Sequence, residues 1–281
     1  MSTIARLVCS ILLLYACCQE ISGQLRYPIA GTYKEKDAQG MAIHGKYAYL
    51  MSSGGLCRQY DLESKLVVKE FFLASSAKDN HVNSVCFGVE NTGQANIPVI
   101  YIGECKYGAR CFVEDLSGDA PKLVQTIKST HNGKIDPVVS WAVDVKHRHI
   151  YSIARGKAVD EAGNVINTIS QYRLPELEEG SEVTLTEKDL LSRFEVIFPN
   201  IIQGCKINGK YLYIVTGLQE TQSHRQDAVR AIQVINLEEN NLKKKIDLTY
   251  VTTNEPEDID FYKGKCLLYC GQEGGLYQIR L

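Results

Sequence analysis

One strand-turn-strand pattern recurs five times along the chain, and this repeat limits the possible folds more than any other feature. Each copy opens with a polar or aromatic residue and a small residue, then places two apolar residues at alternate positions. A turn and a second apolar strand follow, as in QGMAIHGKYAYLMSS, WAVDVKHRHIYSIAR and QGCKINGKYLYIVTG. The five copies begin at Gln39, Asn83, Trp141, Gln203 and Glu257. A repeated supersecondary unit predicts a ring or stack of equal units.

Each copy is followed by a third strand with a similar ending. These strands are CRQYDL (57–62), CFVEDL (111–116), ISQYRL (169–174), IQVINL (232–237) and LYQIRL (276–281). A further β-like or charged stretch follows all but the last of them. Four strands per unit, with unit starts roughly 45 to 60 residues apart, are typical of propeller blades. The sequence therefore predicts an all-β, five-bladed β-propeller, and the alternative is a β-sandwich.

The fifth unit has only three strands of its own. The segment RYPIAGTY (26–33) can supply the fourth, so we expect strands from both ends of the sequence to close the ring and remove its exposed sheet edges. Helical signals are few. The best one lies in SEVTLTEKDLLSRFEVIF (181–198), where Thr186 and Asp189 predict a capped short helix over Lys188–Phe194.

The first residues predict an export signal. Arg6 precedes the apolar run Leu7–Ala16, which is too short for a membrane-spanning helix. Two processing sites compete. The tetrapeptide LYAC resembles a bacterial lipobox that would lipidate Cys17, whereas cleavage after Gly23 would release a secreted protein. We expect a periplasmic, cell-surface or secreted protein that meets a membrane only through a lipid anchor. The predicted divisions are a signal over 1–23 and one propeller domain over 24–281.

Cysteine spacing gives one candidate disulfide. Cys105 and Cys111 bracket the short glycine-containing loop GECKYGARC, and they can bond in an oxidising compartment. Cys266 and Cys270 lie too far apart along one extended run to bond to each other. No cysteine pair has C-x-x-C spacing, so the sequence does not predict a structural zinc site.

The first strand of each propeller blade runs along the central channel, so the residues that open the five units are expected to converge at the channel mouth. Amides, a carboxylate and an indole together are typical of small-molecule recognition. The alternative is that these residues hydrogen-bond to one another and to water and plug the channel. The predicted ligand-binding residues are Gln39, Asn83, Trp141, Gln203, Glu257 and the neighbouring His81. His81 is also the best catalytic candidate, with a structural role as its alternative.

A divalent cation such as calcium needs oxygen ligands, which Asn83, Glu257 and Asp258 can supply. The alternative is a solvated acidic turn in EPEDID. The formal net charge of −2 does not favour a nucleic-acid partner. The sequence also lacks G-x-S-x-G, phosphate-binding G-x-x-x-x-G-K-[ST] and H-E-x-x-H motifs, so no common hydrolase or nucleotide-binding motif is present.

The repeat resembles exported propellers of the strictosidine-synthase-like and regucalcin-like groups, and bacterial five-bladed propeller lipoproteins. Regucalcin-like and paraoxonase-like enzymes hold a divalent cation with Glu, Asn and Asp at the channel mouth, which the resemblance places at Glu257, Asn83 and Asp258. Trp141 and two glutamines depart from that pattern. We therefore expect a binding or scaffold propeller whose channel-mouth pocket takes a small molecule, a glycan or a protein. The alternatives are a cation-dependent hydrolase of the lactonase type and a protein-interaction platform.

Overall fold

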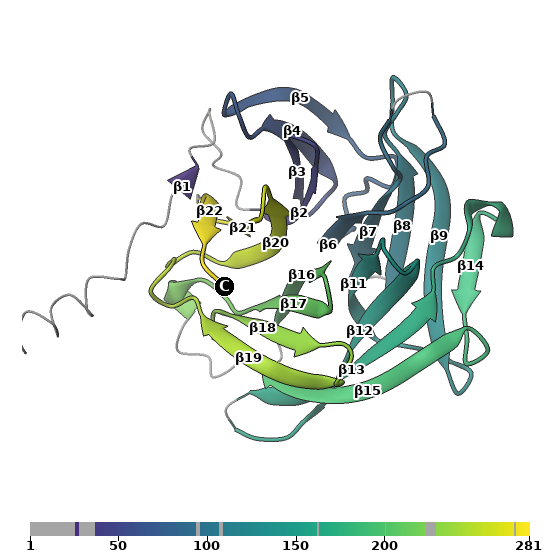
Figure 1. Cartoon of the computed structure of the whole chain (residues 1–281), viewed down its shortest axis with the longest axis vertical. Coiled ribbons are helices and arrows are strands. Elements are labelled where there is room, and N and C mark those ends of the chain that lie inside the picture. Colours follow the sequence, from purple (N-terminus) through teal and green to yellow (C-terminus); the bar gives the residue numbers. More distant parts are fainter. Residues whose placement is uncertain are drawn as a thin grey trace, which may run out of the picture.

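Five small sheets surround a central axis and form a five-bladed β-propeller, as the repeat predicts (Figure 1). The structure is a computed structural model. It describes residues 26–27, 37–93, 96–106, 109–161, 163–199, 201–222, 229–272 and 274–281. The predicted signal over 1–23, including Cys17, lies outside these residues. No helix in the described ranges is long and apolar enough to cross a membrane.

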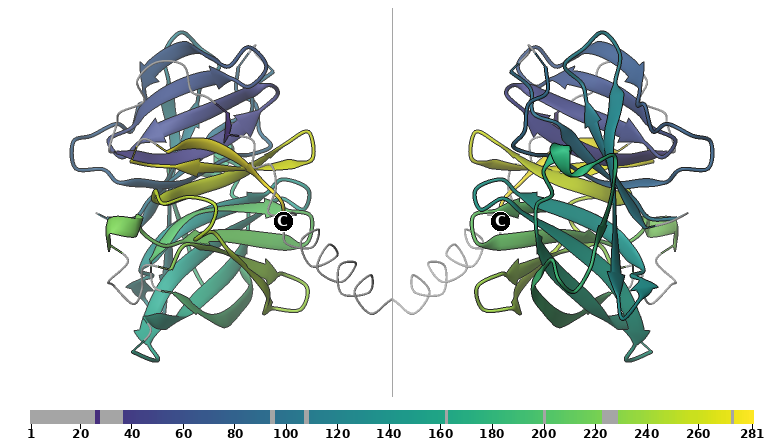
Figure 2. Two further views of the ribbon diagram at one scale, coloured as in Figure 1. Left: turned by 90° about the vertical axis from the view of Figure 1, so that its left-hand side faces the viewer. Right: turned by 90° about the vertical axis from the view of Figure 1, so that its right-hand side faces the viewer.

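Three blades contain four antiparallel strands each, and side views show the twisted blades (Figure 2). Blade 1 comprises β2 (Ala38–His44), β3 (Tyr47–Ser52), β4 (Leu56–Asp61) and β5 (Leu66–Phe72). Blade 4 comprises β16 (Ile202–Asn208), β17 (Tyr211–Thr216), β18 (Ala231–Asn236) and β19 (Asn241–Asp247). Blade 5 comprises β20 (Pro256–Tyr262), β21 (Lys265–Cys270), β22 (Gly275–Ile279) and β1 (Arg26–Tyr27).

Blade 3 also has four antiparallel strands, and a strand inserted within its sequence pairs with blade 2. Blade 2 comprises β6 (Val82–Phe87), β7 (Ile100–Glu104), β8 (Arg110–Asp115), β9 (Lys122–His131) and β10 (Lys134–Ile135). Blade 3 comprises β11 (Val138–Asp144), β12 (His149–Ala158), β13 (Asn164–Arg173) and β15 (Leu190–Pro199). Between β13 and β15 the chain leaves blade 3, and β14 (Glu182–Leu185) pairs in parallel with β9. Two short 3-10 helices are η1 (Leu177–Glu179) and η2 (Glu220–Gln222).

The predicted closure of the ring is confirmed. Strand β1 pairs antiparallel with β22, with Arg26 opposite Tyr277 and Tyr27 opposite Leu276. The first and last described strands therefore lie side by side in blade 5. The rest of the predicted closing segment, 28–33, lies outside the described residues.

The predicted helix over Lys188–Phe194 is wrong. This region forms a turn and then β15, which pairs with β13 and places Phe194 opposite Ile169. Thr186 and Asp189 do interact, but within the turn, where the Asp189 carboxylate accepts from the Thr186 backbone N–H at 2.8 Å. Val196 and Phe198 in β15 are buried and Ile197 between them is exposed, a two-residue period that favours a strand.

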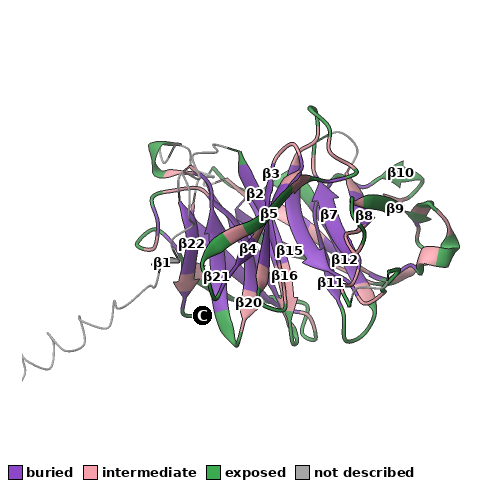
Figure 3. Cartoon of the chain, turned by 90° about the horizontal axis from the view of Figure 1, so that it is seen from above, coloured by how far each residue is buried: buried purple, intermediate pink, exposed green. Residues whose placement is uncertain are grey.

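The hydrophobic core is divided into five clusters, one between each pair of adjacent blades. The cluster between blades 5 and 1, for example, joins Met41 and Leu50 to Leu267 and Tyr269. The inner strands are buried, while the outer strand β5 is largely exposed (Figure 3). The outer strand β19 carries the exposed lysine run 243–245. Each blade therefore depends on both neighbours for its core, which favours a closed ring.

The same bulge occurs in the first strand of every blade. In blade 1, Ala38 lies opposite Ser52 but Met41 lies opposite Leu50, so the first strand holds one extra residue. The matching register shifts in the other blades define equivalent positions around the axis. The bulge begins at the first residue of each of these strands. The third residue of the strand is small in four blades and acidic in one: Gly40, Ser84, Ser140, Gly204 and Asp258.

Asp258 fills the axis at this level. Its Oδ2 atom accepts hydrogen bonds from the backbone N–H groups of Met41 in blade 1, at 2.8 Å, and Val85 in blade 2, at 3.2 Å. A Cβ atom on Gly204 in blade 4 would overlap the Asp258 carboxylate. One carboxylate therefore connects blades 5, 1 and 2, and a glycine in blade 4 makes room for it.

A buried ion pair lies next along the same strands. The Lys206 ammonium of blade 4 is 2.9 Å from Asp260 Oδ2 of blade 5, which also accepts from the Ile43 N–H of blade 1 at 2.7 Å. Burial lowers the pKa of Lys206, but attraction to Asp260 outweighs it, so the pKa is raised overall. The axis is therefore occupied by paired polar groups at two successive levels.

We predict that Asp258→Ala destabilises the fold by about 2–6 kcal/mol, because two buried N–H groups lose their acceptor. Asp258→Asn keeps an acceptor oxygen and is expected to cost less. Urea unfolding of both variants measures this difference. Equal losses for alanine and asparagine would contradict the role of the carboxylate as an acceptor.

Candidate functional site at the start of the first strands

Four of the five predicted channel-mouth residues occupy equivalent positions at the end of the axis where the first strands begin. They are Gln39, Asn83, Gln203 and Glu257, and all four are buried. The bulge register shows that the fifth equivalent is Val139, not Trp141. Trp141 lies two residues further along β11 and is therefore misplaced in the predicted set.

The error arises from the length of one turn. The first hairpins of blades 1, 4 and 5 have two-residue turns, whereas in blade 3 Asp144 pairs with His149 across the four residues 145–148. Val145, which the sequence pattern aligns with buried or partly buried residues of other blades, lies in this turn and is 50% exposed. Two extra residues in the turn shift the alignment of the whole strand by two.

Trp141 belongs to the hydrophobic core. It is 1% exposed and lies in the cluster between blades 2 and 3 with Tyr101, Cys111 and Tyr172. Its indole Nε1 is buried and has no hydrogen-bond partner among the described residues. The side chain contributes packing at this position rather than a surface for a ligand.

We expect Trp141→Ala to destabilise the protein by about 3–5 kcal/mol, as much as Phe87→Ala, because each leaves a cavity between blades. Trp141→Phe is expected to cost less, since it keeps most of the ring volume and removes an unpaired N–H. Equilibrium denaturation of the three variants provides the comparison. A loss below about 1 kcal/mol for Trp141→Ala would contradict core placement.

Two of the four axial residues join neighbouring blades. The Asn83 amide nitrogen lies 2.7 Å from Val139 O and 2.7 Å from Ser140 Oγ in blade 3. Gln203 donates from Nε2 to Glu255 Oε1 at 2.8 Å. These contacts correspond to the alternative in which axial polar groups satisfy one another.

The other two residues keep unpaired oxygens. Gln39 Oε1 and Glu257 Oε2 are buried and have no hydrogen-bond partner within the part of the chain that the structure describes. A Cβ atom on Gly271 would overlap Glu257 Oε1, so a glycine is needed beside this carboxyl group. Buried polar atoms without partners are costly, which makes this pair the feature of the axis that most calls for a ligand or ordered water.

Burial raises the pKa of Glu257 well above its usual value, and the nearby Glu255 and Asp258 carboxylates raise it further. The carboxyl group therefore holds a proton to higher pH than an exposed glutamate does. A protonated carboxyl group can donate a hydrogen bond as well as accept one. Glu257 is thus able to bind a neutral polar group or to exchange a proton with it.

The raised pKa makes a signed prediction for stability. Between the unfolded pKa near 4.5 and the folded pKa, folded Glu257 keeps a proton that unfolding releases, so the unfolding free energy falls as pH rises. Glu257→Gln removes this pH dependence of the unfolding free energy. The variant is therefore expected to become more stable relative to the unchanged protein as pH rises above about 4.5. Chemical denaturation from pH 4 to 8, with exposed Glu182→Gln as the control, measures the difference. A constant difference across this range would contradict the shift.

His81 lies at the same end, in the loop between blades 1 and 2. Its Nδ1 atom is 3.1 Å from Ser53 Oγ. Burial, reinforced by the positive charge of Lys106, lowers the pKa of the imidazole, so the ring is more readily neutral. These contacts support a structural role at the blade boundary.

The predicted Cys105–Cys111 disulfide is not formed in the structure, where both thiols are free. Cys111 faces the cluster between blades 2 and 3, whereas Cys105 lies beyond β7 and packs against the cluster between blades 3 and 4. Because the two side chains point into different interfaces, they do not meet. Burial raises the pKa of Cys105 to about 11, which keeps this thiol protonated.

The predicted cation ligands do not form a ligand group in the structure. The Asp258 carboxylate accepts backbone N–H groups, and Asn83 points its amide nitrogen at oxygen atoms. Within the described ranges, no group of three or more His, Cys, Asp or Glu side chains is arranged to hold a metal ion. The calcium site therefore stays a prediction.

A pocket of about 410 Å³ opens beside this end of the axis, between blades 2 and 3. Its lining includes Val139, which is the blade 3 equivalent of Gln39 and Glu257, together with Lys106 and Arg155. The four polar axial residues are not among the residues that line it. Sequence reasoning missed it, because the lining comes from loops that follow different strands.

Comparison with known proteins supports the fold. The crystal structure of Myxococcus xanthus glutaminyl cyclase superimposes with a TM-score of 0.55 over 92% of this chain and 94% of that chain, at 13% sequence identity. Identity at this level shows a shared propeller architecture alone. No protein-family model matches the sequence. No curated protein matches it in sequence either.

Proposed function

We propose that this protein is an exported propeller that binds a small polar ligand at the end of the axis formed by Gln39 and Glu257. The observation that carries the proposal is the pair of buried, unpartnered oxygens, Gln39 Oε1 and Glu257 Oε2. A ligand that donates to Gln39 and exchanges a hydrogen bond with protonated Glu257 would satisfy both. A pocket between blades 2 and 3 opens at the same end of the axis, where Val139, the blade 3 equivalent of these two residues, lines it.

A thermal-shift screen of amino acids, sugars and other small polar metabolites tests this function. A ligand present at about 100 times its Kd stabilises the folded state by about 2.7 kcal/mol, which raises the melting temperature. The stabilisation is expected to disappear in Gln39→Ala and Glu257→Gln but to persist in Gln59→Ala, a glutamine on β4. A ligand whose effect survives both axial substitutions binds elsewhere and would contradict the proposal. Calcium in the same screen tests the cation-dependent alternative.

An enzyme of the glutaminyl cyclase type is the second candidate. Glutaminyl cyclase is the printed name of the structural neighbour, and Glu257 is a buried carboxyl group with a raised pKa. In such a reaction the amino nitrogen of an N-terminal glutamine attacks its own side-chain amide carbon and ammonia leaves. A carboxyl group that gives and takes protons assists this step.

Ammonia release from a peptide that begins with glutamine tests this candidate. Activity is expected to fall at least about a hundredfold in Glu257→Gln, since general acid-base catalysis contributes that much or more, and to remain in Glu182→Gln. Absence of release by the unchanged protein would exclude the cyclase activity for that peptide. It would leave the binding proposal to the thermal-shift screen.

A further inference from the structure

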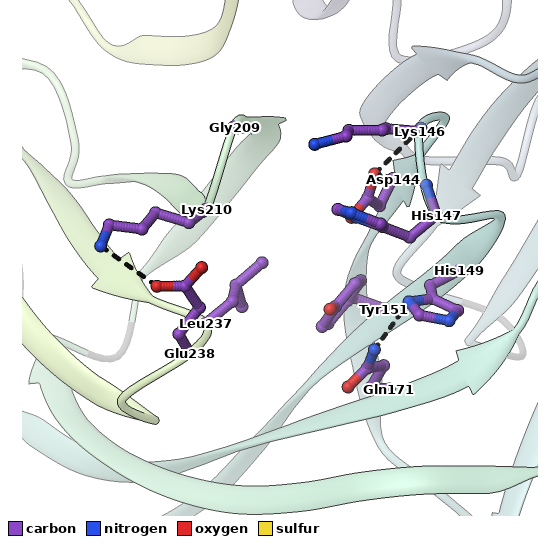
Figure 4. Close-up of a pocket in the computed structure, with 10 residues that line it drawn as sticks. All are labelled: Asp144, Lys146, His147, His149, Tyr151, Gln171, Gly209, Lys210, Leu237 and Glu238. Carbon is purple, nitrogen blue, oxygen red and sulfur yellow. Dashed lines mark hydrogen bonds and ion pairs between the residues drawn. The ribbon is translucent and has the colours of Figure 1, made fainter.

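A second pocket lies between blades 3 and 4, at the end of the axis opposite Gln39 and Glu257. It has a volume of about 320 Å³. Residues of blade 3 form one wall, among them Lys146, His147, His149 and Tyr151, and Lys210 and Glu238 of blade 4 face them across the pocket (Figure 4). The four-residue turn that misaligned the repeat supplies two of these side chains.

The His147 ring is held by a buried carboxylate. Asp144 Oδ2 lies 2.7 Å from His147 Nδ1, and Asp144 Oδ1 accepts from the backbone N–H groups of Lys146 and His147. An ionised carboxylate only accepts, so the hydrogen on this side of the ring belongs to Nδ1. This arrangement fixes the ring and leaves Nε2 without a partner among the described residues.

The His149 ring is held by a second chain of contacts. Ser192 donates to Gln171 Oε1 at 2.8 Å, and Gln171 Nε2 lies 2.7 Å from His149 Nδ1. The amide therefore donates to Nδ1, which places the His149 hydrogen on Nε2. The two imidazole rings lie 6.1 Å apart between centroids, at an interplanar angle of 27°. Both rings are thus oriented by hydrogen-bond partners within blade 3.

The same wall carries two further donors. Tyr151 is 4% exposed, and burial raises its pKa to about 12, so its hydroxyl group keeps a hydrogen. The Tyr151 hydroxyl and the Lys146 ammonium have no partner among the residues the structure describes. The acid on the opposite wall is already paired, since Glu238 Oε2 lies 3.1 Å from Lys210 Nζ. The unpaired polar groups of the pocket are therefore mostly hydrogen-bond donors.

We propose that this pocket binds the anionic group of a small molecule, a carboxylate or a phosphate. The Lys146 ammonium supplies the charge, and the Tyr151 hydroxyl donates a hydrogen bond to the anion. The Asp144 carboxylate on the same wall accepts three donors from the turn and His147. The proposal does not depend on the function assigned to the other end of the axis.

Titration of the full chain with sodium phosphate and with sodium acetate, followed by NMR of the histidine side chains, tests the site. At least one anion is expected to shift the His147 and His149 resonances saturably. Lys146→Ala is expected to weaken that anion about tenfold, because a charge-assisted contact is lost. Lys263→Ala, in the first hairpin turn of blade 5, is the matched control and is expected to have no effect.

Comparison of the two anions shows which chemical group the pocket binds. Saturation by phosphate alone indicates a phosphate group, saturation by acetate alone indicates a carboxylate, and saturation by both supports a general oxyanion site. No saturable shift with either anion, or equal affinity in Lys146→Ala, would overturn the proposal. Zinc ions that shift both imidazoles when neither anion does would overturn it as well.

Discussion

The hydrogen bonds that the Asp258 carboxylate accepts at the axis are the interaction on which the ring most depends. The first strands of all five blades converge there, and each presents backbone groups that its own hairpin does not pair. Asp258 Oδ2 accepts such N–H groups from Met41 and Val85, in the next two blades of the ring. Gly204, at the equivalent position of blade 4, leaves the space that this one carboxylate fills. A ring of five identical side chains would either clash or leave a hole.

The fold was predictable because its evidence in the sequence is repeated five times. Alternating apolar residues specify a half-buried strand, and two-residue turns set the length of the first hairpin in blades 1, 4 and 5. The closing role of the segment around Arg26 and Tyr27 followed from a unit that lacked one strand, and the pairing with β22 confirms it. The predicted helix over Lys188–Phe194 was wrong because Thr186 and Asp189, which can cap a helix, stabilise a tight turn equally well. Pairing with β13 makes the following residues a strand.

The candidate site was predictable only in part. Equivalent positions gave Gln39, Asn83, Gln203 and Glu257, since the repeat fixes their height along the axis. Trp141 was misassigned because the turn after β11 is two residues longer, and counting back from an apolar residue in that turn moved the strand. The sequence also does not show which polar groups satisfy one another. Asn83 and Gln203 use neighbouring blades, while Gln39 and Glu257 keep unpaired oxygens, and this division depends on the bulge and on loops distant in sequence.

Hydrogen exchange of the Met41 and Val85 backbone amides tests most directly whether the axial carboxylate holds the blades together. Both amides donate to Asp258, so opening them requires blades to separate. We expect both to exchange only through global unfolding, with a free energy of exchange equal to that of denaturation. Amides of the exposed outer strand β5 provide the comparison and are expected to exchange through local opening. Exchange of Met41 and Val85 at the rate of those outer amides would contradict the account.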